Sequence, residues 1–412
     1  MTLARNRVLH PVALGRRAAW AVSGLLLAAT AMACEHRATL GSAAETPRGR
    51  EAAMFTKTLY PRICMFWTPV RGDRSIRGHL RHDLMVTSVD WLGLEWDREL
   101  EGLADGFTLE SVEAAKGKLA EIRAQNPDVV LLSELNFYEY HDHALPEDHP
   151  WWLRVDGEKQ QFWPGTHRMD WYNPEYREHI VKQTVALKEA GVPGVYYDNL
   201  RDEPEPWIAM LEEVRSRCGD DFLILANYGY AIDEYDFAAP YLNGIMYESG
   251  FSHGRTEWDE CIEAMQHTQS LLREPRISCI ERFEDIEGSD DGPLPKRRRP
   301  AKRDTAARRW SLCYALIVGD YYYVFTDNTF HGHDWYPEYD VKIGLPAGDG
   351  ERLSSHVWRR EYEKALAVMN LPGAAKAHEV ELEGSARDSF TGETGTRFTI
   401  PPGEGRILVW AE

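Results

Sequence analysis

The sequence predicts an α/β fold: a (β/α)8 TIM barrel followed by a small C-terminal antiparallel β-domain. Three observations support this fold class: eight apolar runs of strand length up to Phe325, helical patterns between them, and a change to short strands after Trp358. Alternating strands and helices with short links imply parallel strands with right-handed crossovers. Eight such units close into a barrel.

The strand predictions rest on apolar runs that end at turn residues or at an acidic or amide residue. The runs are Ile63–Thr68, Leu84–Val89, Val129–Leu135, Val195–Tyr197, Phe222–Ala226, Gly244–Tyr247, Arg276–Ile280 and Tyr321–Phe325. An open doubly wound sheet is the alternative fold. No glycine-rich phosphate loop follows any of these runs, so we favour the barrel.

Helical spacing of apolar residues predicts helices in five of the connecting segments. These are Glu110–Ala124, Pro174–Ala190, Pro206–Cys218, Thr256–Leu272 and Thr305–Ile317. The second has the clearest boundaries, because Asn173 can cap it, Pro174 suits its first turn and Gly191 can end it.

After Trp358 the pattern becomes that of a small β-domain. Short apolar segments are separated by Gly and Pro turns, at Ala365–Met369, His378–Leu382, Thr396–Ile400 and Arg406–Trp410. We therefore expect a barrel over residues 56–358 and a β-domain over 359–412. Residues 35–55 lack periodicity and are expected to be a flexible tether.

The first 34 residues resemble an export signal. Basic residues precede the apolar segment Ala18–Ala33, which ends at Cys34. Leu27–Cys34 is also a degenerate lipobox, so a membrane anchor through a lipid on Cys34 and an unanchored protein both remain open. We expect an exported protein that is periplasmic, extracellular or lipid-anchored to a membrane.

Composition narrows the function classes. The formal net charge is −19, and so acidic a surface repels phosphates and argues against a nucleic acid partner. The chain contains 14 Trp and 19 Tyr, whose rings can stack on sugar rings or simply fill a barrel core. Six Cys occur without a CxxC or other metal-ligand spacing. We expect no cofactor.

Two segments suggest the chemistry. Val192–Asn199 and Leu242–Ser249 each read as a buried strand that finishes on a carboxylate, Asp198 in the first and Glu248 in the second. Acids at the C-terminal ends of barrel strands face one shared pocket. Two carboxylates in one pocket are the minimal apparatus for cleaving a glycosidic bond. The alternative is that either acid caps a helix or pairs with an arginine, such as Arg201 beside Asp198.

Further polar and aromatic residues are expected on the same rim as substrate-binding groups. They are Trp67, Glu134, Asp170, Asn199, Asn227, Tyr228, Glu281, Asp327 and Trp335. Several carboxylates on one rim are unfavourable unless some are hydrogen-bonded, protonated or in contact with a ligand, which itself indicates a polar ligand. Asp170 has a second interpretation, because Asp-x-x-Asn-Pro is also a helix start.

A metal site is the weaker prediction. His141-Asp142-His143 and His331-Gly332-His333-Asp334 lack the i, i+4 spacing of a hydrolytic zinc site, and no third ligand is evident. No Gly-x-Ser-x-Gly elbow is present, which argues against a serine nucleophile. We therefore predict no metal ligands.

Four segments resemble TIM-barrel members of the hypothetical glycosyl hydrolase superfamily, which is related to the endo-α-1,4-polygalactosaminidase group. Arg168–Arg177 resembles their "D-x-x-N-P-x-Y-R" segment, and Gly191–Asn199 is similar to their "G-F-D-G-V-F-x-D-N" strand. Trp335–Pro346 is similar to the segment after their last barrel strand, and Arg359–Asn370 to the start of their C-terminal β-domain. Pro193 and Ala365 depart from the usual Asp and Gly.

The resemblance covers residues 60 to 412 and implies a glycosidase. It implies a catalytic Asp at the end of strand four, here Asp198, and a Glu at the end of strand six, here Glu248. The expected reaction is hydrolysis of a polysaccharide or oligosaccharide by two carboxylates with retention of configuration. A non-catalytic carbohydrate-binding barrel and a metal-dependent hydrolase or deacetylase remain as alternatives.

Overall fold

The structure is a computed structural model that describes residues 59–200, 204–227, 236–248, 258–283, 305–326 and 331–411. The predicted export signal, the tether, Tyr228 and Asp327 lie outside these ranges. All described residues belong to one compact unit, Thr46–Glu412.

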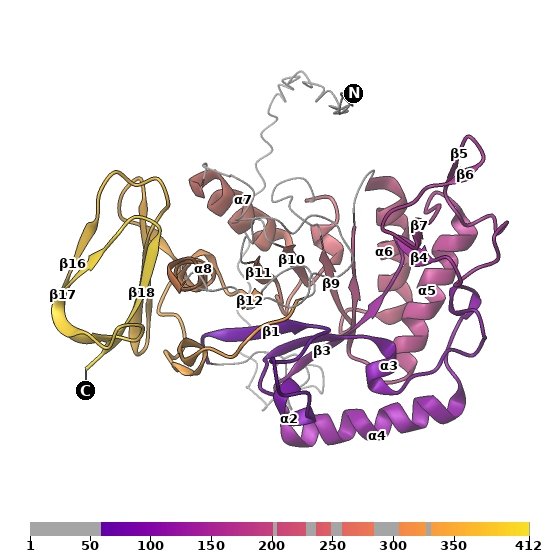
Figure 1. Cartoon of the computed structure of the whole chain (residues 1–412), viewed down its shortest axis with the longest axis horizontal. Coiled ribbons are helices and arrows are strands. Elements are labelled where there is room, and N and C mark those ends of the chain that lie inside the picture. Colours follow the sequence, from indigo (N-terminus) through magenta and orange to yellow (C-terminus); the bar gives the residue numbers. More distant parts are fainter. Residues whose placement is uncertain are drawn as a thin grey trace, which may run out of the picture. The chain divides into compact units, whose positions relative to one another are not determined.

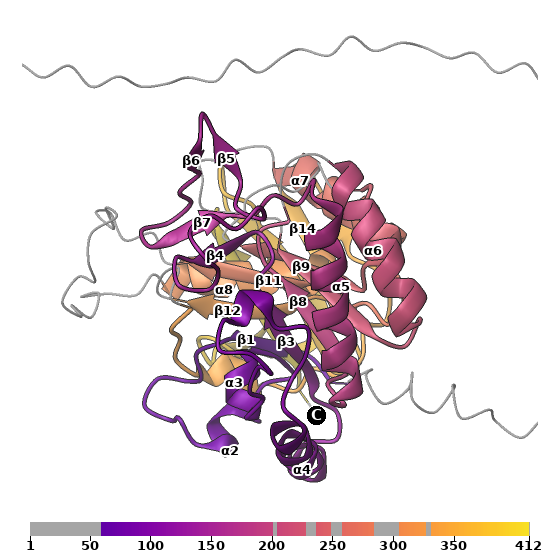
Figure 2. The same cartoon turned by 90° about the vertical axis from the view of Figure 1, so that its right-hand side faces the viewer.

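Eight parallel strands form a closed barrel in the order β1-β12-β11-β10-β9-β8-β3-β2 (Figures 1 and 2). Their bounds are β1 Arg62–Phe66, β2 Leu84–Thr87, β3 Val130–Leu135, β8 Gly194–Tyr197, β9 Leu223–Asn227, β10 Gly244–Glu248, β11 Cys279–Phe283 and β12 Tyr322–Thr326. Each of the eight predicted strand runs overlaps one of these strands, and the predicted fold class is confirmed.

The barrel interior is a packed apolar core below the catalytic face. Inward side chains from all eight strands meet there, including Phe66, Tyr196 and Met246. Side chains alternate along a strand, so residues two positions after this layer also point inward. Asp198 and Glu248 follow Tyr196 and Met246 by two positions, and this alternation positions both acids above the core.

Helices cover the outside of the barrel unevenly. The long helices are α4 Leu109–Gln125, α5 Pro174–Glu189, α6 Pro204–Cys218, α7 Trp258–Leu271 and α8 Thr305–Val318. All five predicted helices are found. The crossover from β1 to β2 holds only α2, Ile76–His79, and α3, Val89–Leu92, precedes α4. The Gly- and Arg-rich sequence between Thr68 and Asp83 lacks a continuous apolar helix face, which explains the short helix there.

The insertion after β3 folds into two small antiparallel pairs. Strand β4, Glu139–His141, pairs with β7, Thr166–Arg168, and β5, Arg154–Val155, pairs with β6, Glu158–Lys159. Short 3-10 turns occur at η1 Glu101–Leu103, η2 Ala239–Tyr241 and η3 Pro337–Asp340.

A six-stranded antiparallel sheet follows the barrel, in the order β13-β14-β15-β18-β16-β17. Its strands are β13 Glu351–Arg352, β14 Val357–Tyr362, β15 Ala365–Asn370, β16 His378–Asp388, β17 Thr394–Ile400 and β18 Glu404–Trp410. The four predicted C-terminal strands are present. β13 and β14 add two strands and extend the sheet across residue 359, where the domain boundary is expected.

Helix α8 packs against this sheet. The Tyr362 hydroxyl donates to the Leu316 carbonyl at 2.7 Å, and Arg360 donates to the carbonyls of Leu316 and Gly319 at 3.1 and 3.0 Å. Strand β18 lies so close to α8 that a Cβ on Gly405 would be 2.7 Å from Sγ of Cys313 on that helix. The side chains of the sheet thereby satisfy carbonyls at the end of α8 that lack helical partners.

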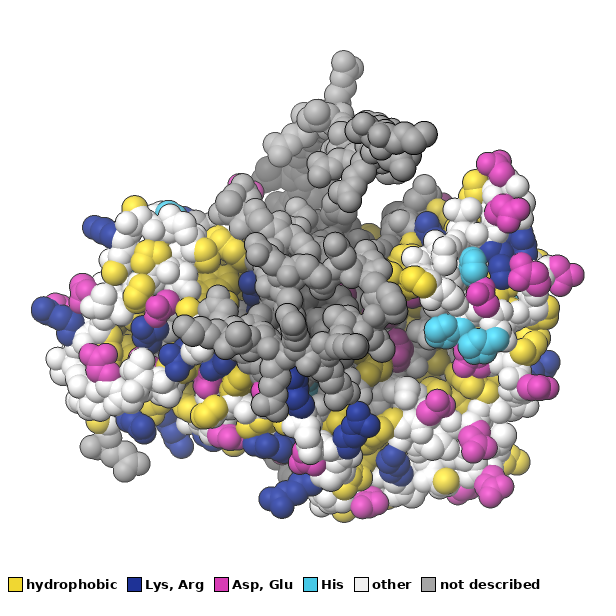
Figure 3. Space-filling view, viewed as in Figure 1, with side chains coloured by type: hydrophobic (Ala, Val, Ile, Leu, Met, Phe, Trp, Pro, Cys, Tyr) yellow, Lys and Arg dark blue, Asp and Glu magenta, His cyan; other side chains and the backbone are white. Residues whose placement is uncertain are grey.

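Two further observations concern the described residues as a set. Cys64, Cys218, Cys279 and Cys313 are free and buried, and Cys261 is buried as well. None of the helices in the described ranges is long and apolar enough to span a membrane. Acidic and basic side chains are interspersed over the face seen in Figure 3.

Candidate active site

The C-terminal ends of the barrel strands gather one cluster of polar side chains. Glu134 lies in β3, Asp198 directly follows β8, Asn227 ends β9, Glu248 ends β10 and Glu281 lies in β11. Trp67, after β1, and His331, in the segment after β12, complete it. Ring and hydrogen-bond contacts, described below, connect these residues across the mouth of the barrel.

Asp198 is half-buried and accepts three hydrogen bonds. Tyr196 Oη donates to Oδ1 at 3.1 Å, Asn199 Nδ2 to Oδ2 at 2.7 Å, and Asn227 Nδ2 to Oδ1 at 2.7 Å. Only an ionised carboxylate offers acceptors to so many donors without donating itself. The surroundings therefore suit an anion at Asp198, the form that a carboxylate nucleophile needs.

Asn227 links the two predicted catalytic acids. Its Nδ2 donates to Asp198 Oδ1 at 2.7 Å and to Glu248 Oε2 at 2.8 Å. An amide group carries two N–H donors, so one nitrogen can serve both carboxylates. This amide fixes the spacing of Asp198 and Glu248.

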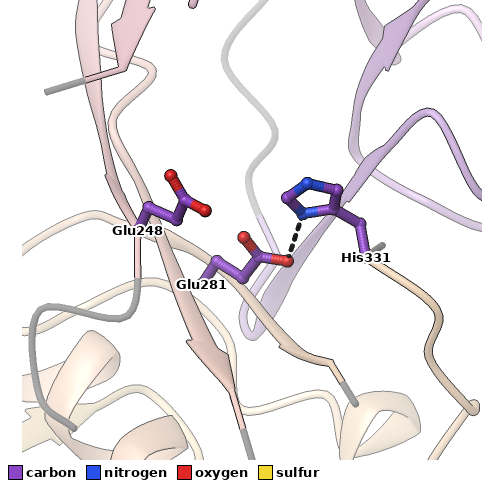
Figure 4. Close-up of side chains that lie close together, drawn as sticks. All are labelled: Glu248, Glu281 and His331. Atoms are coloured by element: carbon purple, nitrogen blue, oxygen red, sulfur yellow. Dashed lines mark hydrogen bonds and ion pairs between the residues drawn. The ribbon is translucent and has the colours of Figure 1, made fainter. Parts of the chain in front are cut away.

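Glu248 and Glu281 are register partners on the neighbouring strands β10 and β11, so their side chains lie side by side (Figure 4). Burial, and then the charges of Glu281 and Asp198, raise the pKa of Glu248 from 4.5 to about 7. A carboxyl group with such a pKa can carry a proton at neutral pH, which a general acid requires.

His331 contacts Glu281 from across the pocket. Its Nδ1 lies 2.7 Å from Glu281 Oε1, as the dashed line in Figure 4 shows. Burial alone would lower the pKa of His331, but the charge of Glu281, followed by those of Glu248 and Asp198, raises it above its ordinary value. The surrounding carboxylates therefore favour the protonated form of His331.

Glu134 is a second carboxyl group with a strongly altered pKa. Trp67 Nε1 donates to its Oε2. Burial and the nearby charge of Asp198 raise the pKa of Glu134 to about 8. Asp198 thus has neighbours with raised pKa values on two strands, Glu134 on β3 and Glu248 on β10.

Backbone strain also concentrates at this site. Trp67, Asn199 and His331 have φ values of 52°, 56° and 56°, a left-handed region that non-glycine residues seldom adopt. Such residues persist only where the surrounding structure enforces them, and they cluster at functional sites. The rings of Trp67 and His331 also contact each other in a tilted arrangement, with centroids 4.5 Å apart.

The donor atoms of Glu248, Glu281 and His331 lie within 4.8 Å of one another, a spacing that could hold a metal ion. However, His331 Nδ1 and Glu281 Oε1 are already 2.7 Å apart. Two ligands of one zinc ion, each about 2.0–2.1 Å from the metal in tetrahedral geometry, stand more than about 3 Å apart. These two atoms are therefore hydrogen-bonded as an ion pair rather than spaced as two ligands of one ion.

The structure brings together seven of the predicted site residues and separates two. Asp170 Oδ1 accepts from the Tyr172 backbone N–H at 3.2 Å, which fits the helix-start interpretation. Trp335 packs against His82 and Arg81, and its Nε1 donates to Asp340. Within the described ranges, no contact joins Asp170 or Trp335 to Asp198 or Glu248. Tyr228 and Asp327 lie outside those ranges.

Sequence reasoning missed His331 as a partner of the acids and considered it only as a metal ligand. Tyr196, which donates to Asp198, was likewise seen only as part of a strand. The one available signal was position, because His331 lies in the loop region after the last barrel strand, on the catalytic face.

Comparisons with known proteins concern the family and the fold. Residues 206–366, from α6 to β15, match the model of the family described as hypothetical glycosyl hydrolase family 15. No curated protein matches the chain.

Solved structures share the fold at low sequence identity. A GH27 β-L-arabinopyranosidase from Geobacillus stearothermophilus is 12% identical, with a TM-score of 0.52 over 88% of this chain and 98% of its own. A noncanonic maltogenic α-amylase, AmyB from Thermotoga neapolitana, is 13% identical, with a TM-score of 0.50 over 85% of this chain and 99% of its own. At this identity the likeness concerns the fold.

The family match covers four of the barrel strands and the start of the C-terminal sheet, including Glu248 and Glu281. Together with the closed parallel barrel, it confirms the predicted resemblance and the prediction of an enzyme that hydrolyses glycosides. The chain is a glycosidase of the TIM-barrel type, matched over residues 206–366 to hypothetical glycosyl hydrolase family 15.

Proposed function

We propose that this chain is an exported glycosidase that cleaves O-glycosidic bonds in a polysaccharide or oligosaccharide with retention of configuration. Asp198 is the nucleophile and Glu248 is the general acid and base. The observation that carries the proposal is the double hydrogen bond of Asn227, at 2.7 Å to Asp198 and 2.8 Å to Glu248.

This double bond limits the separation of the two carboxylates. The accepting oxygens stand no farther apart than about 5.5 Å, the two bonds laid end to end, and retaining enzymes space their carboxyl groups by about 5–5.5 Å. Inverting enzymes need about 6.5–9.5 Å, because a water molecule must fit beside the sugar. The short spacing favours retention.

The two acids then divide the reaction between them. Asp198 attacks the anomeric carbon while Glu248 gives its proton to the leaving oxygen, so the glycosidic C–O bond breaks and a glycosyl ester forms on Asp198. In the second step Glu248 takes a proton from water, and the water oxygen displaces Asp198. The raised pKa of Glu248, about 7, suits both its roles.

Export is the second part of the proposal. It rests on the basic residues before Ala18, the apolar run to Ala33 and the cysteine at position 34. Such a protein meets glycans in the periplasm or outside the cell, either free or anchored through a lipid on Cys34. The net charge of −19 argues against a nucleic acid partner.

The test is a hydrolysis screen that follows the anomeric configuration of the first product by proton NMR. Wild type is compared with Asp198→Asn, with Glu248→Gln and with Asp90→Asn, an exposed acid on α3. The expected result is a product of retained configuration from wild type and Asp90→Asn, with losses of several orders of magnitude in the other two. An inverted product would refute retention, and full activity in Asp198→Asn would refute the assignment of the nucleophile.

A further inference from the structure

Glu281 is a fully buried carboxylate with an incomplete set of partners. Its side chain is 0% exposed, and Oε1 is bonded to His331 Nδ1 at 2.7 Å. Its second oxygen, Oε2, has no hydrogen-bond partner among the described residues. A buried carboxylate is unfavourable unless it is paired, so an unshared oxygen in this position calls for a functional explanation.

The register of the barrel fixes what that oxygen faces. Glu281 is the partner of Glu248 in the β10–β11 pair, and in Figure 4 both carboxyl groups lie on the same side of these strands. Parallel neighbours are about 4.8 Å apart, so two side chains in register on one face interact directly. A negative charge on Glu281 therefore acts on Glu248 at close range.

The other groups around Glu248 come from the neighbouring strand β9, from β8 and β3 beyond it, and from the segment after β12. Asp198 follows β8 and is ionised in the proposed mechanism, while Asn227 on β9 donates to Glu248 and carries no charge. Tyr196 on β8 holds Asp198, and Glu134 lies beyond Asp198 on β3. His331 is the basic side chain of this cluster, and it is hydrogen-bonded to Glu281.

We propose that Glu281 is a positioning residue that favours the acid form of Glu248, and that His331 is a positioning residue that holds Glu281 beside it. A charge on Glu281 disfavours a second charge on its register partner Glu248, and the hydrogen bond to His331 Nδ1 fixes the buried Glu281 carboxyl group in that place. This inference rests on the proposed role of Glu248 as general acid. It gives a role in tuning Glu248 to one residue of β11 and to one residue of the segment after β12.

The ring contact and the backbone of His331 support this assignment. The ring centroids of Trp67 and His331 lie 4.5 Å apart in a tilted arrangement, so the indole packs against the imidazole. The backbone of His331 has a φ of 56°, a strained conformation that the surrounding structure must hold in place. Both features keep the imidazole on Glu281.

The kinetic test is the pH dependence of kcat/KM. In wild type, the alkaline limb reports loss of the Glu248 proton and is expected near pH 7. Glu281→Gln should move this limb down by about one pH unit, which is about a tenfold loss at pH 8 and little loss at pH 5. Glu281→Asp keeps the charge, so its limb should stay close to that of wild type even if its rate falls.

The role of His331 is tested by making the same substitution in wild type and in Glu281→Gln. The charge of His331 also acts directly on Glu248 and lowers its pKa, so His331→Gln should move the limb in both backgrounds. The two shifts should differ, because only the wild-type background also contains the effect that passes through Glu281. Equal shifts in both backgrounds would overturn the proposed route through Glu281. An equal loss for Glu281→Gln at every pH would show a purely structural role.

A second measurement works without substrate and separates this inference from the proposed function. In protein labelled with 13C at glutamate carboxyl groups, the Glu248 resonance is identified by its absence in Glu248→Gln. Its titration midpoint should fall by about one unit in Glu281→Gln. An unchanged midpoint refutes the inference even if glycosidase activity is found, and a shifted midpoint supports it even if the reaction proves to be another.

Discussion

The indole of Trp67 donates a hydrogen bond to the carboxyl group of Glu134, linking the segment after β1 to β3. This bond holds one oxygen of an acid that burial and the charge of Asp198 keep protonated to about pH 8. The pocket therefore contains a second protonated carboxyl group besides Glu248. Stability and activity measurements can distinguish the role of Glu134 from that of Glu248.

Glu134→Gln should stabilise the protein at alkaline pH. The pKa of Glu134 is about 8 in the folded state and 4.5 ordinarily, so the folded state binds this proton more tightly. Wild type consequently loses stability as pH rises from about 4.5 to about 8, and the uncharged amide removes that loss. Urea unfolding should show a gain in the free energy of unfolding of up to about 4 kcal/mol at pH 8 and almost none at pH 4.5.

The matched control is Glu383→Gln on the exposed side of β16, which should show no such pH dependence. If Glu134→Gln raised the free energy of unfolding equally at pH 8 and pH 4.5, ionisation of Glu134 would not be the cause.

Glu248→Gln and Glu134→Gln should differ in how activity depends on the leaving group. Loss of the general acid is most harmful when the leaving oxygen is basic. Glu248→Gln should therefore lose about 10²–10⁴-fold on alkyl glycosides and far less on dinitrophenyl glycosides. Glu134→Gln should reduce activity by similar factors on the alkyl and the dinitrophenyl glycosides. The reverse pattern would make Glu134 the acid.

Asn227→Ala should reduce kcat more than it raises KM. The change removes the amide that donates to Asp198 and Glu248 at 2.7 and 2.8 Å, so both carboxylates lose their fixed spacing. Misplacement of reacting groups costs about 10²-fold in rate. Steady-state kinetics beside Asn126→Ala, whose amide bonds backbone carbonyls outside the pocket, provides the control. An unchanged kcat would show that the bridge has no part in catalysis.

Prolonged dialysis against a chelator should leave the glycosidase rate unchanged. The hydrogen bond between Glu281 Oε1 and His331 Nδ1 is shorter than the distance between two ligands of one zinc ion. Metal analysis of the purified protein and rates before and after dialysis test this. Loss of activity that added zinc restores would favour the metal-dependent hydrolase instead.

Gly405→Ala should destabilise the protein by about 1–3 kcal/mol, as overpacked cores do. Its new Cβ would meet Cys313 Cβ and Sγ at 2.7 Å, with no open space to relieve the clash. Gly384→Ala is the control, because nothing lies within 4 Å of a Cβ at that strand position. Equal unfolding midpoints for the two variants would show that β18 can move away from α8.

The strands, and with them two of the acids, could be predicted because the signal is local. An apolar run that ends in a carboxylate places Asp198 and Glu248 on the catalytic rim whatever the rest of the chain does. Strand β11 was predicted at Arg276–Ile280 but runs from Cys279 to Phe283. The apolar pattern breaks at Glu281, yet the strand continues there because His331 pairs with the buried acid.

Side-chain partners could not be predicted, because they come from distant parts of the chain. His331 and Glu281 are 50 positions apart in the sequence. No residue pattern in either segment indicates that the two side chains form a pair. Trp335 shows the converse: it looks like a sugar-stacking residue by position, but Arg81 and Asp340 hold it against the barrel wall. A pattern predicts that a residue lies on the catalytic face, not which neighbour it contacts.

The contact between α8 and the C-terminal sheet has a consequence for how the chain unfolds. Arg360 and Tyr362 bond carbonyls at the end of the helix that leads into β12, the strand that closes the barrel against β1. Removing the sheet would leave those carbonyls and the α8 face without partners, so we expect barrel and sheet to melt in one cooperative transition. A truncated barrel is therefore a poor substitute for the whole chain in any assay.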